Sequence, residues 1–375
     1  MESSAWVYII LFILTVGIAS FMINPVYAGI QAKCVCSRKQ TWNTILMFCI
    51  FCLLAGVSAC RIAVGNDYWV YTQNFELIAQ GRKVASEIGF NFIAWLIQWI
   101  FGYRAYLPIF GLYSLVTVFF FVKAIHVLST WYAASLFLLL ANGYYFASLN
   151  NVRYYLVLTI ALYSIPYLLN RAYFKFVALI LIAALFHMSV LLVLPVYAIA
   201  FYCASHKPKR ILWVIIALFT VSLLLFPTLY RTLIFQIYPY YEGSAYDIAR
   251  ISWTNVAKCV ATLILSLLCY KDQLKWKEQD AWVIQKRFYF YLNLGALILY
   301  TCATFIPEIS RIGYYLTITQ ILYLPALLRD LKPSRLRTLC ILGTGAAFLL
   351  YFAMFLRDAY ETSIRILPYR SWIFQ

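Results

Sequence analysis

The chain has 375 residues, of which 65% are hydrophobic, 19% are aromatic and only 11% are charged. A soluble domain carries about 25% charged residues, so this composition excludes a soluble enzyme, a secreted disulfide scaffold and a disordered protein. The mean hydropathy of +0.81 favours an all-α, polytopic integral membrane protein, because helices satisfy their own backbone hydrogen bonds inside a bilayer.

The charge is unbalanced, with 30 Lys and Arg against 13 Asp and Glu and a net charge of +17. Proteins that bind nucleic acid gather such charge on one solvated face, whereas here it is dispersed between apolar runs, so we expect no nucleic-acid partner. The expected surroundings are a lipid bilayer, with four basic loops in the cytoplasm by the positive-inside rule, at residues 33–39, 206–210, 271–287 and 329–337. No zinc-ligand spacing completes a site among the ten cysteines, and no P-loop is present, so we expect no metal and no cofactor.

A membrane span needs about 20 predominantly apolar residues. With two irregular segments at 90–101 and 173–203, the apolar runs predict about 11–13 transmembrane or re-entrant helices in a single membrane domain of residues 1–375. The ten clear candidate spans are 6–28, 44–60, 106–127, 131–149, 154–169, 211–229, 256–270, 288–306, 312–328 and 339–356.

The two irregular segments allow two threadings. Residues 90–101 are short for a span, and residues 173–203 are long for one span and short for two. Segment lengths favour a re-entrant piece at 90–101 and a polar break at His187, which places Arg153 outside. In the alternative, 90–101 spans, 173–203 is one helix and Arg153 faces inward. Both threadings place four segments on the outer face, namely the loops 61–87 and 230–253, the short turn 307–311 and the tail 357–375.

The first motif follows the second span, where Arg61 precedes Gly65-Asn66-Asp67-Tyr68 and Tyr71. Gly and Asn suit a turn, Asp67 can cap a following helix, and Tyr68 and Tyr71 fall three apart on one helical face. The motif predicts either a carboxylate with aromatic platforms for a sugar or a capped interfacial helix within an aromatic belt.

Two arginines enter spans from the predicted outer face: Arg153, which follows Asn151, and Arg311, which precedes Tyr314. An arginine at an outer helix end can bind phosphate oxygens with its planar fork of donors. The alternative is an arginine that snorkels to the interface.

His187 lies deep in an apolar run. It is either a hydrogen-bonded core residue or a general base suited to neutral pH. The outer loop that contains Glu242 and Arg250 is rich in tyrosine and carboxylate, which fits carbohydrate stacking and the ordinary interface belt equally well.

In their order along the chain, these motifs resemble the EpsG-type family of bacterial polysaccharide polymerases, which is related in role to the Wzy O-antigen and capsule polymerases. One position departs from the family, which often has glutamine where this chain has Tyr154 after the arginine. The matching residues are Arg61, Gly65, Asn66, Asp67, Tyr68, Tyr71, Glu87, Gly89, Phe90, Asn151, Arg153, Phe186, His187, Ser189, Pro195, Ser310, Arg311, Tyr314, Pro368 and Tyr369.

The resemblance implies a GT-C-like glycosyltransferase at the outer face of the bacterial cytoplasmic (inner) membrane. Such an enzyme transfers a growing glycan from undecaprenyl pyrophosphate to the next lipid-linked repeat unit. Its partners would be undecaprenyl-pyrophosphate-linked oligosaccharides, and a chain-length regulator is a further candidate.

The resemblance and the chemistry together predict a role for each candidate residue. Arg153 and Arg311 bind the pyrophosphate, and His187 is the base for the acceptor hydroxyl. Asp67 is the second choice as base or orients the sugar. The predicted substrate contacts are Arg61, Tyr68, Tyr71, Asn151, Glu242, Arg250 and Tyr314.

Two other functions share these features. A flippase or transporter of lipid-linked oligosaccharide would also be basic, aromatic and polytopic, although we find no paired repeats of broken helices of the kind that many transporters contain. An O-antigen ligase-like glycosyltransferase would use closely overlapping chemistry.

Overall fold

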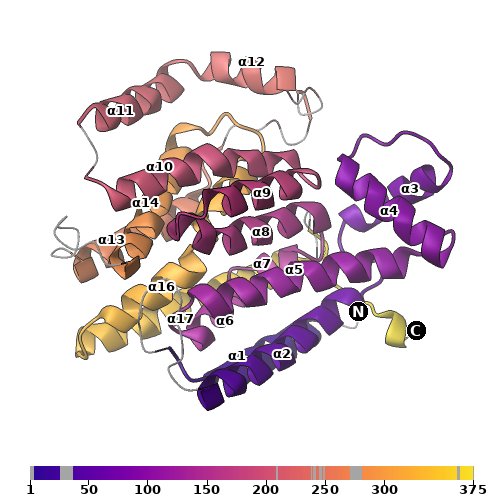
Figure 1. Ribbon diagram of the computed structural model, residues 1–375, viewed down its shortest axis with the longest axis horizontal. Coiled ribbons are helices and arrows are strands. Elements are labelled where there is room, and N and C mark those ends of the chain that lie inside the picture. The colour runs from indigo at the N-terminus through magenta and orange to yellow at the C-terminus, as the bar shows by residue number, and fades with distance from the viewer. Residues whose placement is uncertain are drawn as a thin grey trace. The chain divides into compact units, whose positions relative to one another are not determined.

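The computed structural model describes the chain except for residues 1–3, 26–36, 208–209, 238, 240–241, 245–246, 248–249, 271–280, 361–363 and 375. The predicted outer loop 230–253, the outer tail 357–375 and the basic loops at 33–39, 206–210 and 271–287 therefore lie partly outside the described residues. Helices form the described fold, and an isolated antiparallel bridge joins Arg61 to Ser371 (Figure 1). The predicted all-α class is confirmed.

The chain forms two compact units, the first made of Met1–Leu191 with Leu328–Gln375 and the second of Leu192–Leu327. The helices of unit 1 are α1 (Ala5–Ser20), α2 (Ser37–Ala59), α3 (Asp67–Ala79), α4 (Ile88–Phe101), α5 (Tyr106–Leu128), α6 (Tyr132–Ala141), α7 (Tyr144–Ala147), α8 (Val152–Leu169), α9 (Tyr173–Ala184) and α17 (Arg335–Asp358). Those of unit 2 are α10 (Val193–Ser205), α11 (Arg210–Leu225), α12 (Pro227–Ile237), α13 (Trp253–Tyr270), α14 (Ala281–Cys302), α15 (Ile309–Thr317) and α16 (Gln320–Asp330), which ends just past the boundary.

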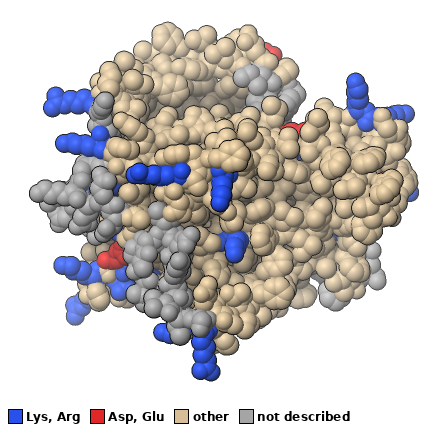
Figure 2. Space-filling view, viewed as in Figure 1, with Lys and Arg blue, Asp and Glu red and all other residues tan. Residues whose placement is uncertain are grey.

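Among the described residues, five helices are long and apolar enough to cross a membrane, or six if the pair α11–α12, bent by 87°, forms one span. Five shorter apolar helices accompany them, so several of the predicted 11–13 segments are short helices rather than full spans. Figure 2 shows a face covered mainly by uncharged residues. Large apolar side chains such as Phe174, 85% exposed, and Trp99, 74% exposed, lie on the surface. A bilayer accounts for this exposure, and the multi-pass membrane class is confirmed.

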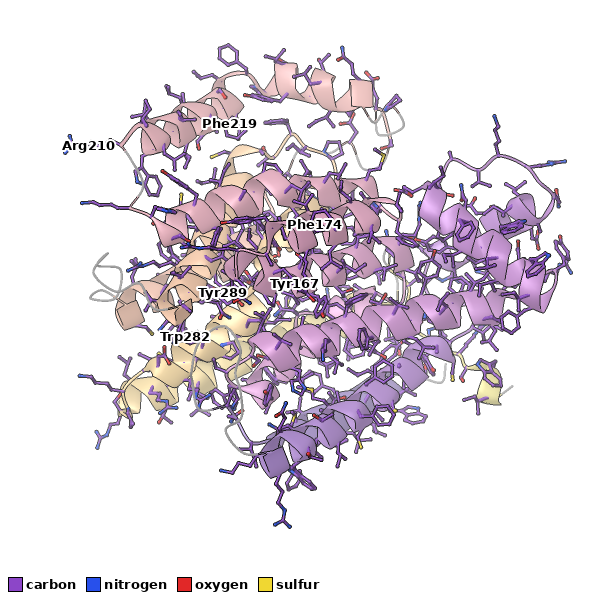
Figure 3. The ribbon with its side chains drawn as sticks, in the orientation of Figure 1. Tyr167, Phe174, Arg210, Phe219, Trp282 and Tyr289 are labelled. Carbon is purple, nitrogen blue, oxygen red and sulfur yellow. The ribbon has the colours of Figure 1, made fainter. Side chains whose placement is uncertain are left out.

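Helix α8 is the centre of unit 1. It packs against α5 and α9, and these three helices run side by side in Figure 1. Nearly every residue of α8 is buried; the exceptions are Arg153, Tyr163 and Tyr167. The hydroxyls of the two tyrosines lie 3.2 Å apart, and Figure 3 labels Tyr167 on this helix. A helix that is apolar on all sides belongs in the interior, so α8 provides a fixed base for Arg153 at its start.

In unit 2, helix α14 packs against α10, α13 and α15. Tyr289, labelled on α14 in Figure 3, is buried and accepts a hydrogen bond from Gln285 Nε2 at 2.9 Å. One turn further on, Asn293 accepts a 2.8 Å bond from Gln320 Nε2 and donates to the Cys259 carbonyl at 3.0 Å. These bonds satisfy buried amides and fix α13 and α16 against α14.

The predicted break at His187 is confirmed. Helix α9 ends at Ala184, a 3-10 turn covers Met188–Leu192, and α10 begins at Val193. The short segment predicted at 90–101 is the 14-residue helix α4, which packs against α3 and α5. The break agrees with the favoured threading, whereas the re-entrant path of 90–101 and the side of the membrane on which each end lies stay predictions.

The C-terminal tail pairs with the loop that follows α2. The amide of Ile62 donates to the Arg370 carbonyl at 3.0 Å, and the amide of Gly65 donates to the Arg365 carbonyl at 3.0 Å. Tyr369 donates its hydroxyl to the Val57 carbonyl at 3.0 Å and packs edge-to-face on Tyr8. These contacts tie the tail to α1 and to the end of α2.

Replacing Tyr369 by Ala removes this ring contact and leaves the Val57 carbonyl without its donor. We expect the free energy of unfolding to fall by about 2 kcal/mol, measured as a lower melting temperature of the purified protein in detergent. Trp372→Ala is the matched control, because that ring is 46% exposed. Equal melting temperatures for the two variants would contradict the tail contact.

Candidate functional site

The side chain of Arg153 lies at the start of α8 among aromatic rings and one carboxylate. Its Nη1 donates to Glu87 Oε2, and the two side chains are only 23% and 20% exposed. The guanidinium carbon lies 5.1 Å from the centre of the Phe90 ring and 5.7 Å from that of Tyr71. Nε is buried without a hydrogen-bond partner in the described part of the chain. Arg153 is thus a largely desolvated cation held by an ion pair and two ring faces.

Asn151 organises the turn into α8. Its Oδ1 accepts the backbone N–H of Tyr154 at 3.2 Å, which caps the helix, and the hydroxyl of Tyr71 at 3.2 Å. Burial raises the pKa of Tyr71, so its hydroxyl remains protonated and able to donate. The predicted contact residue Asn151 therefore fixes α3 against the start of α8 and holds Arg153 in place.

Asp67 is the first residue of α3, and the N-cap is Asn66 rather than the predicted Asp67. The backbone N–H of Asp67 donates to the Asn150 side chain at 2.9 Å. Gly65 makes this approach possible, since a Cβ at its φ of +94° would lie 2.8 Å from the Asn150 Cα. The Asp67 carboxylate thus belongs to the same end of unit 1 as Arg153.

The helix break is attached to α4 by a close backbone contact. The amide of Gly89 donates to the Leu185 carbonyl at 2.8 Å, and a Cβ on Gly89 would lie 2.8 Å from that oxygen. Glu87 stands two residues before this contact, and His187 stands two residues after Leu185. Glycine at 89 therefore lets the backbone before α4 approach the backbone of the helix break.

His187 packs its ring edge-to-face on Tyr154, with centroids 5.8 Å apart. Its Nδ1 lies 2.9 Å from the Ser189 hydroxyl and 3.4 Å from the Ser189 amide. Donation from Nδ1–H to the hydroxyl places the lone pair on Nε2, the tautomer that a base requires, whereas donation from the amide favours the opposite tautomer. Tyr154, which stands where the family often has glutamine, thus supplies a ring contact to His187.

Tyr68 and Tyr71 do share one face of α3, and that face is buried. They are 6% and 3% exposed. Tyr68 stacks on Phe110 with centroids 4.5 Å apart. Both rings therefore pack inside unit 1, and neither presents an open face in this conformation.

Arg61 is 1% exposed. Its Nη1 donates to the Ser58 carbonyl and, at 2.7 Å, to Ser114 Oγ, and the guanidinium lies 5.4 Å from the Phe110 centroid. Burial lowers its pKa to about 10, so it stays charged at neutral pH. A surface anion cannot reach it in this conformation; its visible contacts join α2, α5 and the tail.

Unit 2 holds the other predicted residues. Arg311, in the first turn of α15, forms an ion pair with Glu308 at 3.0 Å, and the two side chains are 35% and 28% exposed. Tyr314 follows on the same helix and is partly buried. Glu242 and Arg250 are exposed. The structure thus gathers Asp67, Asn151, Arg153 and His187 in unit 1, with Arg311, Tyr314, Glu242 and Arg250 in unit 2.

These features define an all-α, multi-pass membrane protein with a partly buried arginine–glutamate site beside a helix break. The sequence profile of the EpsG family matches residues 44–371, and the chain belongs to this family. Membership supports a polysaccharide polymerase-type role of the glycosyltransferase kind. No curated protein and no solved structure shows a significant match to the chain.

Glu87 and Gly89 were not among the predicted site residues, although both belong to the motifs that carry the family resemblance. A signal was available for Glu87, because a carboxylate is one way to stabilise a partly buried arginine and Glu87 precedes the short segment. Gly89 carried no such signal, since its contact with Leu185 depends on how α4 packs.

We expect Gly89→Ala to push the start of α4 away from Leu185, because the new Cβ would overlap a backbone carbonyl. The free energy of unfolding should fall by about 1–3 kcal/mol, measured by thermal denaturation in detergent. Gly111→Ala on α5 is the matched control, because its Cβ would meet nothing within 4 Å. A stable Gly89→Ala protein with full activity would contradict this positioning role.

Proposed function

We propose that this chain is a polysaccharide polymerase that transfers a growing glycan from undecaprenyl pyrophosphate to the next lipid-linked repeat unit. The observation that carries the proposal is the partly buried Arg153, held at the start of α8 beside the break that contains His187. Family membership supports the polymerase role. The reaction is assigned to the outer face of the bacterial cytoplasmic membrane, where a chain-length regulator is a further candidate partner.

Arginine suits the leaving group of this reaction. When the acceptor oxygen bonds to the anomeric carbon, the bond from that carbon to the pyrophosphate oxygen breaks and its electron pair leaves with the phosphate. Arg153 and Arg311 each lie in the first turn of a helix, where the helix dipole adds to the guanidinium charge. Both can stabilise the charge that develops on the pyrophosphate.

The acceptor hydroxyl must lose a proton as it attacks. We assign this proton to His187 Nε2, in the tautomer in which Nδ1–H donates to the Ser189 hydroxyl. Asp67, at the same end of unit 1, is the second candidate for this role or orients the sugar. The carboxylate Glu242 and the arginine Arg250 remain candidate contacts for the glycan.

We expect Arg153→Ala, His187→Ala and Arg311→Ala each to reduce polymerisation by about 10²–10³-fold, as is typical when a group that stabilises the transition state is lost. The gene for each variant replaces the native gene, and the glycans that the cells make are resolved by gel electrophoresis. Single capped repeat units should persist, with normal amounts of protein in the membrane. Arg104→Ala, at a side chain 65% exposed, should retain long polymer.

The same gel distinguishes the alternatives. A flippase defect removes surface repeat units altogether, whereas a polymerase defect leaves single units on display. A ligase defect leaves long polymer that stays on its lipid carrier. Long polymer in all three alanine variants would refute the assignment of these residues.

A further inference from the structure

Arg153 has hydrogen-bonding capacity that Glu87 does not use. A guanidinium presents five N–H donors, and a carboxylate that docks on it side by side takes two of them. Here Glu87 is bound through Nη1, while Nε is buried with no hydrogen-bond partner among the described residues. A ligand with more oxygens than a carboxylate could satisfy this arginine more completely.

The surroundings of Arg153 keep its position independent of Glu87. The faces of Phe90 and Tyr71 lie 5.1 and 5.7 Å from the guanidinium, and Asn151 caps the helix on which Arg153 stands. If the carboxylate left, the cation would still lie against two rings at a capped helix start. Its geometry would then suit an incoming anion.

Glu87 is able to leave. It precedes α4 in an extended conformation, and its side chain makes no capping bond to that helix. Its side chain is 20% exposed, so it is not completely enclosed by the protein. The backbone contact at Gly89 and the packing of α4 against α3 and α5 hold this helix without the Glu87 carboxylate, so the Glu87 side chain can rotate without moving the helix.

We propose that Glu87 is a displaceable stand-in for phosphate: in the empty protein it neutralises Arg153, and a pyrophosphate group must displace it to bind. This inference rests on the proposed function for the identity of the ligand. The inference adds that the Glu87 carboxylate competes with the donor lipid for Arg153. This competition keeps Arg153 paired between catalytic cycles and lowers the affinity of the protein for the donor.

The test measures binding without any acceptor, so it does not require polymerisation. Inorganic pyrophosphate is titrated by calorimetry into the full-length chain in nanodiscs, and undecaprenyl pyrophosphate is measured in parallel. The proteins are wild type, Glu87→Gln, Arg153→Gln and the double variant. Glu76→Gln is the matched control, since the Glu76 carboxylate accepts the Tyr106 hydroxyl at 2.5 Å and lies 3.6 Å from Arg104 Nε.

Removal of the competitor should lower the Kd of Glu87→Gln by at least about tenfold for one or both ligands. Glu76→Gln should bind as wild type does, and Arg153→Gln should lose binding in both backgrounds. Without ligand, Glu87→Gln should melt at a lower temperature than wild type, and added pyrophosphate should raise its melting temperature to that of wild type. If Glu87→Gln does not fold, Glu87→Asp, which is shorter by one methylene, should show a smaller gain in affinity.

An unchanged or weaker affinity of Glu87→Gln for both ligands would overturn the proposal, as would binding that survives Arg153→Gln. The outcome is separable from the polymerase function. If Glu87→Gln binds more tightly but the protein forms no polymer, the proposal that Glu87 competes with pyrophosphate would stand and the polymerase function would be rejected. If the protein forms polymer but Glu87→Gln binds as wild type does, the polymerase function would stand and the competition by Glu87 would be rejected.

Discussion

The ion pair between Arg153 and Glu87 joins the start of α8 to the start of α4 within unit 1. Arg153 stands at the start of α8, a largely buried helix, where an unpaired charge would be destabilising. The carboxylate that pairs with it comes from Glu87, 66 residues earlier in the chain. To place Glu87 there, α4 must approach the turn after α9 so closely that only glycine fits at position 89. The helix break, the short helix α4 and the cap at Asn151 all serve this arrangement.

The class of the protein and the break in its long apolar segment could be predicted from the sequence. Both depend on local composition and length, since a bilayer sets how many apolar residues a helix needs. The break at His187 followed from a segment too long for one span and too short for two. Arg153 was a candidate because charge at a helix end inside a membrane protein is rarely incidental.

The pairings and the buried faces could not be predicted. Spacing placed Tyr68 and Tyr71 on one face of α3, but periodicity does not say whether that face packs against other helices or lies at the membrane surface. The bridge of Arg61 to Ser371 joins residues at opposite ends of the chain, and the ion pair of Arg153 depends on the packing of α4. The division into two units could not be predicted either, because unit 1 combines residues from both ends of the chain.

The most direct measurement is polymerisation by the purified chain alone. Purified protein in proteoliposomes is incubated with undecaprenyl-pyrophosphate-linked repeat units, with and without a chelator, and the products are resolved as a gel ladder. We predict a ladder in both samples, with one undecaprenyl pyrophosphate released for each bond formed and no ladder from Arg153→Ala. Failure of active, folded protein to lengthen any unit, or transport of the lipid across the bilayer without lengthening, would contradict the polymerase assignment.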